Sequence, residues 1–168
     1  CISGTEQLRP VWEMLNLRQW LPFDLLCGAV DRHHSMFGYM RSHGIPEREI
    51  LWFADRPCPP DVVGINYYVT SDRYIDHRTD LYSPDLMSSE GPFVDVEAVR
   101  VREDGIRGFG AALRDAWDRY NIPVALTEVH LGCDPEEQIR WLASAWQDAT
   151  DVRRAGVHCV ALTVWALL

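Results

Sequence analysis

Residues 61–70 read DVVGINYYVT. This short run of β-branched and aromatic residues is almost continuously apolar, which is typical of a strand buried on both faces in a parallel sheet. We therefore predict a strand at about 61–69. Two further apolar runs, at about 123–129 and 159–168, have the same character and predict two more strands of that sheet.

The segments between these strands have the pattern of helices. Residues 108–120 and about 134–155 carry apolar side chains at helical spacing, and three more helices are expected upstream, at 6–20, 36–42 and 47–55. The alternation of strand and helix predicts an α/β protein with a parallel sheet, the whole chain of 168 residues forming a single partial domain.

Composition limits the function classes. The chain is 47% hydrophobic with a formal charge of −9, so a core is expected, while nucleic acid and anionic membranes are not expected partners. No apolar run approaches the roughly eighteen residues of a membrane span. The five cysteines include no Cys-x-x-Cys pair, and a cytoplasmic location is the default expectation. A first residue other than Met, together with an apolar run at the end, leads us to expect a piece of a longer chain.

The loops carry no nucleotide motif. Gly105, Gly108 and Gly110 precede a helix but follow no strand, unlike the glycine-rich phosphate loop of a nucleotide-binding sheet. We therefore expect no cofactor. The polar stretch 71–105 is too long for a simple connection and is interpreted as a functional loop.

A (β/α)₈ barrel explains the positions of the remaining polar and aromatic residues better. In such barrels the chemistry lies at the C-terminal ends of the strands. In this chain those ends carry Asn66, Tyr68, Glu128 and Trp165. A carboxylate among aromatic side chains is typical of a sugar site.

Four segments make this interpretation more specific: WLPFDLLCG (20–28), GINYY (64–68), LTE (126–128) and VWALL (164–168). Their order and spacing resemble glycoside hydrolase family 1, the β-glucosidase-type barrels. The last three are similar to the family's sixth, seventh and eighth strand motifs. The resemblance covers nearly the whole chain and implies an incomplete (β/α)₈ TIM barrel, from the helix after strand 5 through strand 8.

The resemblance also assigns roles. It implies that Glu128 is the catalytic nucleophile, that Tyr68 orients it, and that Asn66, Trp165 and His130 bind a glycoside substrate. A retaining glycosidase needs a second carboxyl roughly 5–5.5 Å from the nucleophile. The family places that acid/base in an Asn-Glu-Pro segment, which this chain lacks, so the chain by itself is expected to be inactive.

One departure from the family pattern suggests an alternative function. The family continues its nucleophile as Thr-Glu-Asn-Gly, whereas residues 127–130 are TEVH. With SDRY at 71–74, this looks more like a divergent branch of family 1-like barrels, some of which are fused ahead of a dTDP-4-dehydrorhamnose reductase domain. The alternative is therefore a non-catalytic carbohydrate-binding or structural barrel attached to such a reductase.

Structural roles remain open for each candidate residue. Glu128 is alternatively a strand-end carboxylate paired with an arginine or lysine. Tyr68 and Trp165 are alternatively core residues, and Asn66 a residue that bonds the backbone at the strand end.

Two other groups have the residue types of a functional site. The adjacent His33 and His34 have no i, i+4 partner, so no metal is expected there. Cys133, just before a helix, would have a lowered pKa if it were exposed, but a structural cysteine is the preferred interpretation.

Overall fold

The computed structural model describes residues 1–165, and the chain forms two compact units. Unit 1 comprises residues 1–60 and 73–96, and unit 2 comprises residues 61–72 together with the chain from Glu97 onward. The two units are described separately below. That all 168 residues belong to one partial domain stays a prediction.

Unit 2 contains a parallel three-stranded sheet in the order β2-β5-β6. The strands are β2 (Val63–Asn66), β5 (Val124–Val129) and β6 (Cys159–Val164). Each lies within a run predicted from the sequence, although residues 166–168 of the third run lie outside the described residues. Within the described chain only β5 has a neighbour on both sides, so the sheet is small and unclosed.

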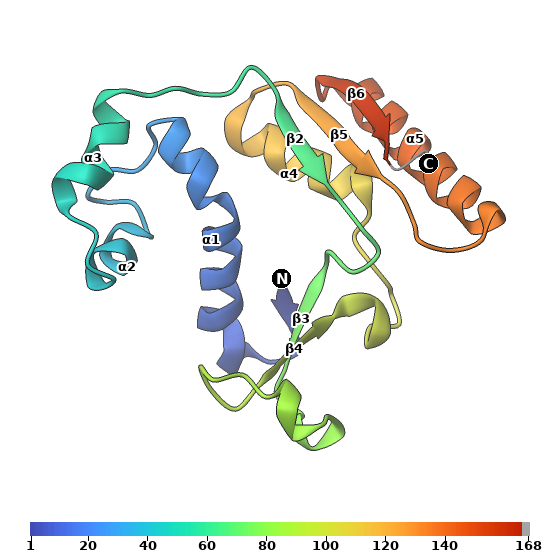
Figure 1. The fold of residues 1–168 in the computed structure, drawn as a ribbon, viewed down its shortest axis with the longest axis horizontal. Helices are drawn as coiled ribbons and strands as arrows, with labels where there is room; N and C mark the ends of the chain where they lie inside the picture. Colours follow the sequence, from blue (N-terminus) through green and yellow to red (C-terminus); the bar gives the residue numbers. More distant parts are fainter. Residues whose placement is uncertain (166–168) are drawn as a thin grey trace. The chain divides into compact units, whose positions relative to one another are not determined.

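Two helices cover one face of this sheet, as Figure 1 shows. They are α4 (Phe109–Tyr120) and α5 (Pro135–Arg154), and they contact each other as well as the strands. The N-terminus of α5 follows from local chemistry, because the Asp134 side chain accepts a hydrogen bond from the Glu137 amide at 3.0 Å. Between sheet and helices lies an apolar core that includes Val63, Phe109, Leu113, Val124, Leu126, Ala145 and Val152.

Unit 1 is mainly helical in its first part. Its helices are α1 (Arg9–Leu26), preceded by the 3-10 turn η1 (Glu6–Leu8), then α2 (Phe37–Ser42) and α3 (Glu47–Asp55). Leu17 and Leu21 of α1 pack on a buried cluster formed by Val30, Met36, Met40 and Ile50. The prediction of a helix at 6–20 ended too early, because Pro22 is accommodated within α1, which continues to Leu26.

The stretch expected to be a loop, 71–105, contains regular structure. Strands β3 (Arg73–Asp76) and β4 (Val94–Glu97) form a second sheet with β1 (Ile2–Ser3), in the order β1-β3-β4. The loop interpretation was wrong because these strands are four residues long, too short for a periodic signal. Three 3-10 turns, η2 (Thr79–Leu81), η3 (Pro84–Leu86) and η4 (Ala98–Arg100), complete the segment.

A buried carboxylate, Asp76, ends β3. Its side chain is fully buried and accepts hydrogen bonds from the Arg78 amide at 2.9 Å, the Arg78 guanidinium at 2.8 and 3.0 Å, and the Tyr82 hydroxyl at 2.7 Å. Hydrogen bonds from Arg78 hold the pKa of Asp76 well below its usual range. Burial, and then the hydrogen bond to Asp76, raise the pKa of Tyr82 to about 12.

Among residues 1–165, no helix combines the length and the apolar character that crossing a membrane requires.

Candidate active site

An irregularity in strand pairing aligns the two candidate strand ends. Val63, Gly64 and Ile65 of β2 pair in sequence with residues 124–126 of β5, but Asn66 then pairs with Glu128 instead of Thr127. The pairing of β5 with β6 also shifts, between Leu126 and Val129. Bulges of this kind re-aim side chains and are common beside active sites. Here the shift brings Asn66 level with Glu128.

The Tyr68 hydroxyl donates a hydrogen bond to Oε2 of Glu128. This bond and the Glu128 charge raise the pKa of Tyr68, so the phenol stays protonated and acts as the donor. Glu128 is half-buried, and in the described chain it forms no ion pair with an arginine or lysine. The geometry therefore favours the tyrosine-oriented carboxylate over a structural ion pair.

Asn66 is exposed, and its side-chain oxygen accepts a hydrogen bond from the Thr127 hydroxyl at 2.6 Å. Thr127 can lean across β2 because residue 64 is glycine: a Cβ there would lie 2.9 Å from Thr127 Cγ2. Asn66 is thus held by a side chain from the neighbouring strand, in contrast to the backbone partner proposed as its structural role.

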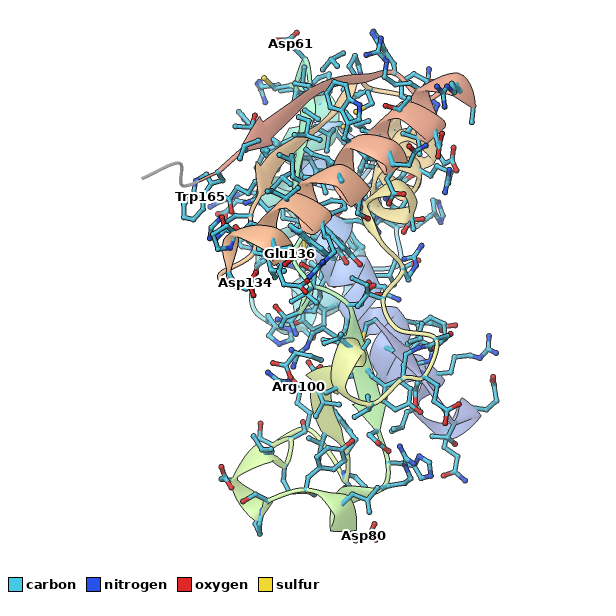
Figure 2. The ribbon with its side chains drawn as sticks, turned by 90° about the vertical axis from the view of Figure 1, so that its right-hand side faces the viewer. Asp61, Asp80, Arg100, Asp134, Glu136 and Trp165 are labelled. Carbon is cyan, nitrogen blue, oxygen red and sulfur yellow. The ribbon has the colours of Figure 1, made fainter. Side chains whose placement is uncertain are left out.

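Two aromatic side chains lie beyond the strand ends. Trp165 follows β6, is 49% exposed, and donates its amide to the Val129 carbonyl at 3.3 Å. The His130 ring lies edge-on to it, with centroids 6.3 Å apart. Figure 2 shows Trp165 at the same end of unit 2 as Asp134 and Glu136 at the start of α5, and opposite to Asp61.

Tyr67 and Asp72 were missed by the sequence interpretation. Tyr67 is 5% exposed and donates its hydroxyl proton to Asp72 at 2.7 Å. The alternation of side chains along a strand gives a usable signal, because Tyr67 must face away from Tyr68 and hence toward the helices. The partner Asp72, five positions further on, has no such signal.

The structure shows contacts of His34 and a pKa shift of Cys133, which belong to the two other groups considered as sites. His34 accepts the Met36 amide at Nδ1, and its Nε2 lies 3.3 Å from the buried carboxylate of Asp24. In residues 1–165 no group of three or more His, Cys, Asp or Glu side chains is placed to hold a metal ion. The expectation for an exposed Cys133 was wrong in sign: desolvation and the negative charge of Asp134 raise the pKa of its thiol.

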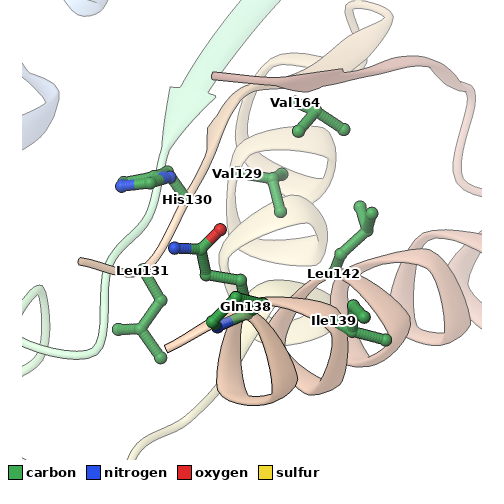
Figure 3. Close-up of a pocket in the computed structure, with 8 residues that line it drawn as sticks. Val129, His130, Leu131, Gln138, Ile139, Leu142 and Val164 are labelled. Carbon is green, nitrogen blue, oxygen red and sulfur yellow. The ribbon is translucent and has the colours of Figure 1, made fainter. Parts of the chain in front are cut away.

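A cavity of about 200 Å³ lies between α5 and the ends of β5 and β6 (Figure 3). Val129, Leu131, Ile139, Leu142 and Val164 make most of its lining apolar. His130, a candidate substrate-binding residue, also lines the cavity, whereas Glu128 is not among its lining residues.

The parallel strand–helix order of unit 2 gives a mixed α/β fold that resembles part of a TIM-barrel glycosidase. In particular, the chain is similar to a β-glucosidase from Thermotoga maritima, with 19% sequence identity and a TM-score of 0.64 over 98% of this chain. A family 1 β-glucosidase structure from the same organism gives 17% identity and a TM-score of 0.61 over 98%. The AHE enzyme from Alicyclobacillus herbarius gives 14% identity and a TM-score of 0.65 over 97% of this chain.

These comparisons confirm the expected resemblance to family 1 glycoside hydrolases at the level of fold. The chain spans 38%, 39% and 38% of the three matched chains, respectively. No protein-family model matches the sequence, and no curated protein matches it in a sequence search.

Proposed function

We propose that this chain is the nucleophile-bearing part of a retaining, β-glucosidase-like O-glycoside hydrolase, with Glu128 as the nucleophile. The observation that carries the proposal is the hydrogen bond from Tyr68 to Glu128. It joins a carboxylate and a phenol at the ends of adjacent parallel strands, in a fold shared with β-glucosidases. Strand ends of this kind hold the catalytic groups of (β/α)₈ enzymes.

The chemistry requires Glu128 to attack the anomeric carbon while the glycosidic oxygen leaves as an alcohol. The carboxylate oxygen forms a covalent glycosyl ester, a general acid protonates the leaving oxygen, and water then hydrolyses the ester. Tyr68 occupies one oxygen of Glu128 and leaves the other to react. The chain contains no Asn-Glu-Pro segment, so the acid/base comes from protein outside these 168 residues.

The neighbouring side chains match the needs of a sugar. Trp165 offers an exposed ring face for stacking, and His130, edge-on to it, offers a ring nitrogen to a hydroxyl. Asn66 presents an amide level with Glu128. The similar T. maritima β-glucosidase has been solved in complex with glucoimidazole, which supports a carbohydrate as the partner.

The direct test is covalent trapping. The full-length protein is incubated with a 2-fluoro β-glucoside bearing a good leaving group, and the labelled peptide is identified by mass spectrometry. We expect the label on Glu128, and none in a Glu128→Gln variant. Glu97→Gln is the matched control and should label normally. Label on another residue, or persistent label in Glu128→Gln, would overturn the assignment.

The His130–Trp165 ring pair also suits the alternative of a carbohydrate-binding barrel without turnover. Such a barrel, attached to a sugar-nucleotide reductase, needs stacking surfaces but no second carboxyl. Calorimetry with glucosides separates the two: binding at micromolar affinity without product release and without covalent label supports the alternative, and measurable hydrolysis excludes it.

A further inference from the structure

Two consecutive tyrosines follow β2 and point to different partners. Tyr68 donates a hydrogen bond to Glu128, whereas Tyr67 is buried. The Tyr67 ring is stacked on that of Trp141, with centroids 6.4 Å apart, and tilted against that of Phe109, with centroids 5.1 Å apart. The proposed function uses only Tyr68. The role of Tyr67 is therefore a separate question.

The Tyr67 hydroxyl is fully engaged. It accepts the Gly108 amide at 2.8 Å and donates to Asp72 at 2.7 Å, and the same Asp72 oxygen also accepts the Arg107 amide at 2.6 Å. Burial and the adjacent Asp72 raise the pKa of Tyr67 far above its ordinary value. The phenol therefore remains a donor at any physiological pH. We call Tyr67, Asp72, Arg107 and Gly108 the Tyr67 clamp.

Gly108 fits this clamp for two reasons. Its φ of 84° lies in the left-handed region that favours glycine, and an added Cβ would lie 3.2 Å from Asp148 Oδ2. Asp148 in turn accepts the Gly110 amide at 2.8 Å. The amides of residues 107, 108 and 110 are thus bound by the protein's own side chains, which leaves them unsuited to holding a phosphate.

The clamp encloses the residue that contacts Glu128. Tyr68 lies between Tyr67 and Asp72, and the turn that joins them is closed by two bonds: the Tyr68 amide to Ser71 Oγ at 2.8 Å, and the Ser71 amide to the Tyr68 carbonyl at 2.9 Å. The backbone of Tyr68 is consequently fixed on both sides, by a buried ring before it and by Asp72 after it.

We propose that Tyr67 and Asp72 are positioning residues, which hold the Tyr68 hydroxyl on Glu128 by tying the 68–71 turn to the start of α4. The inference rests on the proposed function for its catalytic meaning, but its structural content is independent of turnover. Loss of the clamp lets the Tyr68 hydroxyl leave the carboxylate while the strand and its core contacts remain.

The test is NMR of the protein labelled with ¹³C at the Cζ atom of its tyrosines. The Tyr68 signal is identified by its absence from the spectrum of Tyr68→Phe. Tyr67→Phe keeps the buried ring and removes the hydroxyl. We expect it to move the Tyr68 signal at neutral pH, and to lower the pKa of Tyr68 toward the ordinary value of about 10. Glu128→Gln should change the Tyr68 signal and the pKa of Tyr68 in the same directions as Tyr67→Phe. Tyr82→Phe, which removes a hydroxyl on Asp76, is the control and should leave Tyr68 unchanged.

A second pair of variants separates positioning from general structural damage. The half-buried Asp72 is replaced by Ala, which removes the acceptor, or by Asn, which keeps one acceptor oxygen. Asp72→Ala should reproduce the Tyr67→Phe result, and Asp72→Asn should restore most of the wild-type Tyr68 signal. If Tyr67→Phe fails to fold, the two Asp72 variants still test the inference.

The outcomes distinguish the inference from the proposed function. If Glu128→Gln moves the Tyr68 signal but neither Tyr67→Phe nor Asp72→Ala does, the clamp does not position Tyr68, and the Tyr68–Glu128 pair stands. If Glu128→Gln has no effect either, the Tyr68–Glu128 contact itself is wrong, and the observation behind the proposed function is lost with it.

Discussion

Asp76 in unit 1 and Glu128 in unit 2 are both carboxylates bound by a tyrosine hydroxyl, but their surroundings differ. Asp76 is fully buried, and its donors, Arg78 and Tyr82, lie within six residues of it in the chain. Glu128 is half-buried and receives Tyr68 from a strand end 60 residues away. A carboxylate saturated with local donors stabilises the fold, whereas one with an unoccupied oxygen can react.

Exchanging each carboxylate for its amide should give opposite results. In the full-length protein, Glu128→Gln should lower kcat/KM on an aryl β-glucoside by at least about 10³-fold, with the free energy of unfolding within about 0.5 kcal/mol of wild type. Asp76→Asn should lower the free energy of unfolding by about 2 kcal/mol, because the buried carboxylate loses its charge-assisted hydrogen bonds with Arg78, and should leave turnover unchanged. Steady-state kinetics and urea unfolding measure both.

The control for Asp76→Asn is Asp95→Asn. Asp95 pairs with Arg73 at 2.8 Å, but its side chain is 41% exposed, so its loss should cost less than about 0.5 kcal/mol. Equal costs for the two variants would mean that burial does not distinguish them, and the comparison with Glu128 would lose its basis.

Tyr68 and Tyr82 should differ in the same way: loss of the Tyr68 hydroxyl should affect turnover, and loss of the Tyr82 hydroxyl should affect stability. Tyr68→Phe removes the donor to Glu128 and should lower kcat about tenfold, the order expected for one hydrogen bond, with no loss of stability. Tyr82→Phe leaves Asp76 one donor short and should lower the free energy of unfolding by about 1 kcal/mol, with kcat unchanged. A stability loss in Tyr68→Phe without a kinetic effect would show that Tyr68 is structural.

The contribution of Asp76 to stability should depend on pH, because the pKa of Asp76 is depressed in the folded protein. Its stabilising contribution is complete above the unfolded-state pKa of about 4 and is lost as the pH falls through the lower folded-state pKa. The stability difference between wild type and Asp76→Asn should therefore be constant from pH 7 to about pH 5 and shrink below about pH 4. Urea unfolding at a series of pH values measures it. A difference that grows on acidification would contradict the assignment.

Sequence patterns predicted the parts of this fold whose signals are local. The helix at about 134–155 and the β-branched run before Asn66 required no tertiary information, and parallel strand ends were expected to bring Tyr68 and Glu128 to one edge. The four-residue strand Arg73–Asp76 gave no such signal, since its only regularity is the buried Ile75 and Asp76 at its end. Its stability comes from pairing with a distant segment, Ile2–Ser3.

The finer geometry of the candidate site also depends on contacts between distant residues. The shift that pairs Asn66 with Glu128 arises between two strands about 60 residues apart, and no property of either strand alone specifies it. The partners of Tyr67 are similarly remote, since Gly108 lies 41 positions away. Residue identities at the strand ends were thus predictable, whereas the hydrogen bonds that hold them in place were not.

The last prediction concerns Gly64, which tests whether the Asn66 side of the site depends on close strand approach. A Cβ at position 64 would lie 2.9 Å from Thr127 Cγ2 and 3.3 Å from its Oγ1, so Gly64→Ala should push Thr127 aside and weaken its hydrogen bond to Asn66. We expect a loss of about 1 kcal/mol in the free energy of unfolding, as for modest overpacking, and a small rise in KM. Adding Thr127→Ser removes Cγ2 and keeps the hydroxyl, so the double variant should recover most of both losses. A double-mutant cycle with no coupling between positions 64 and 127 would show that Gly64 does not serve to accommodate Thr127, and that the position of Asn66 is set by the strand register alone.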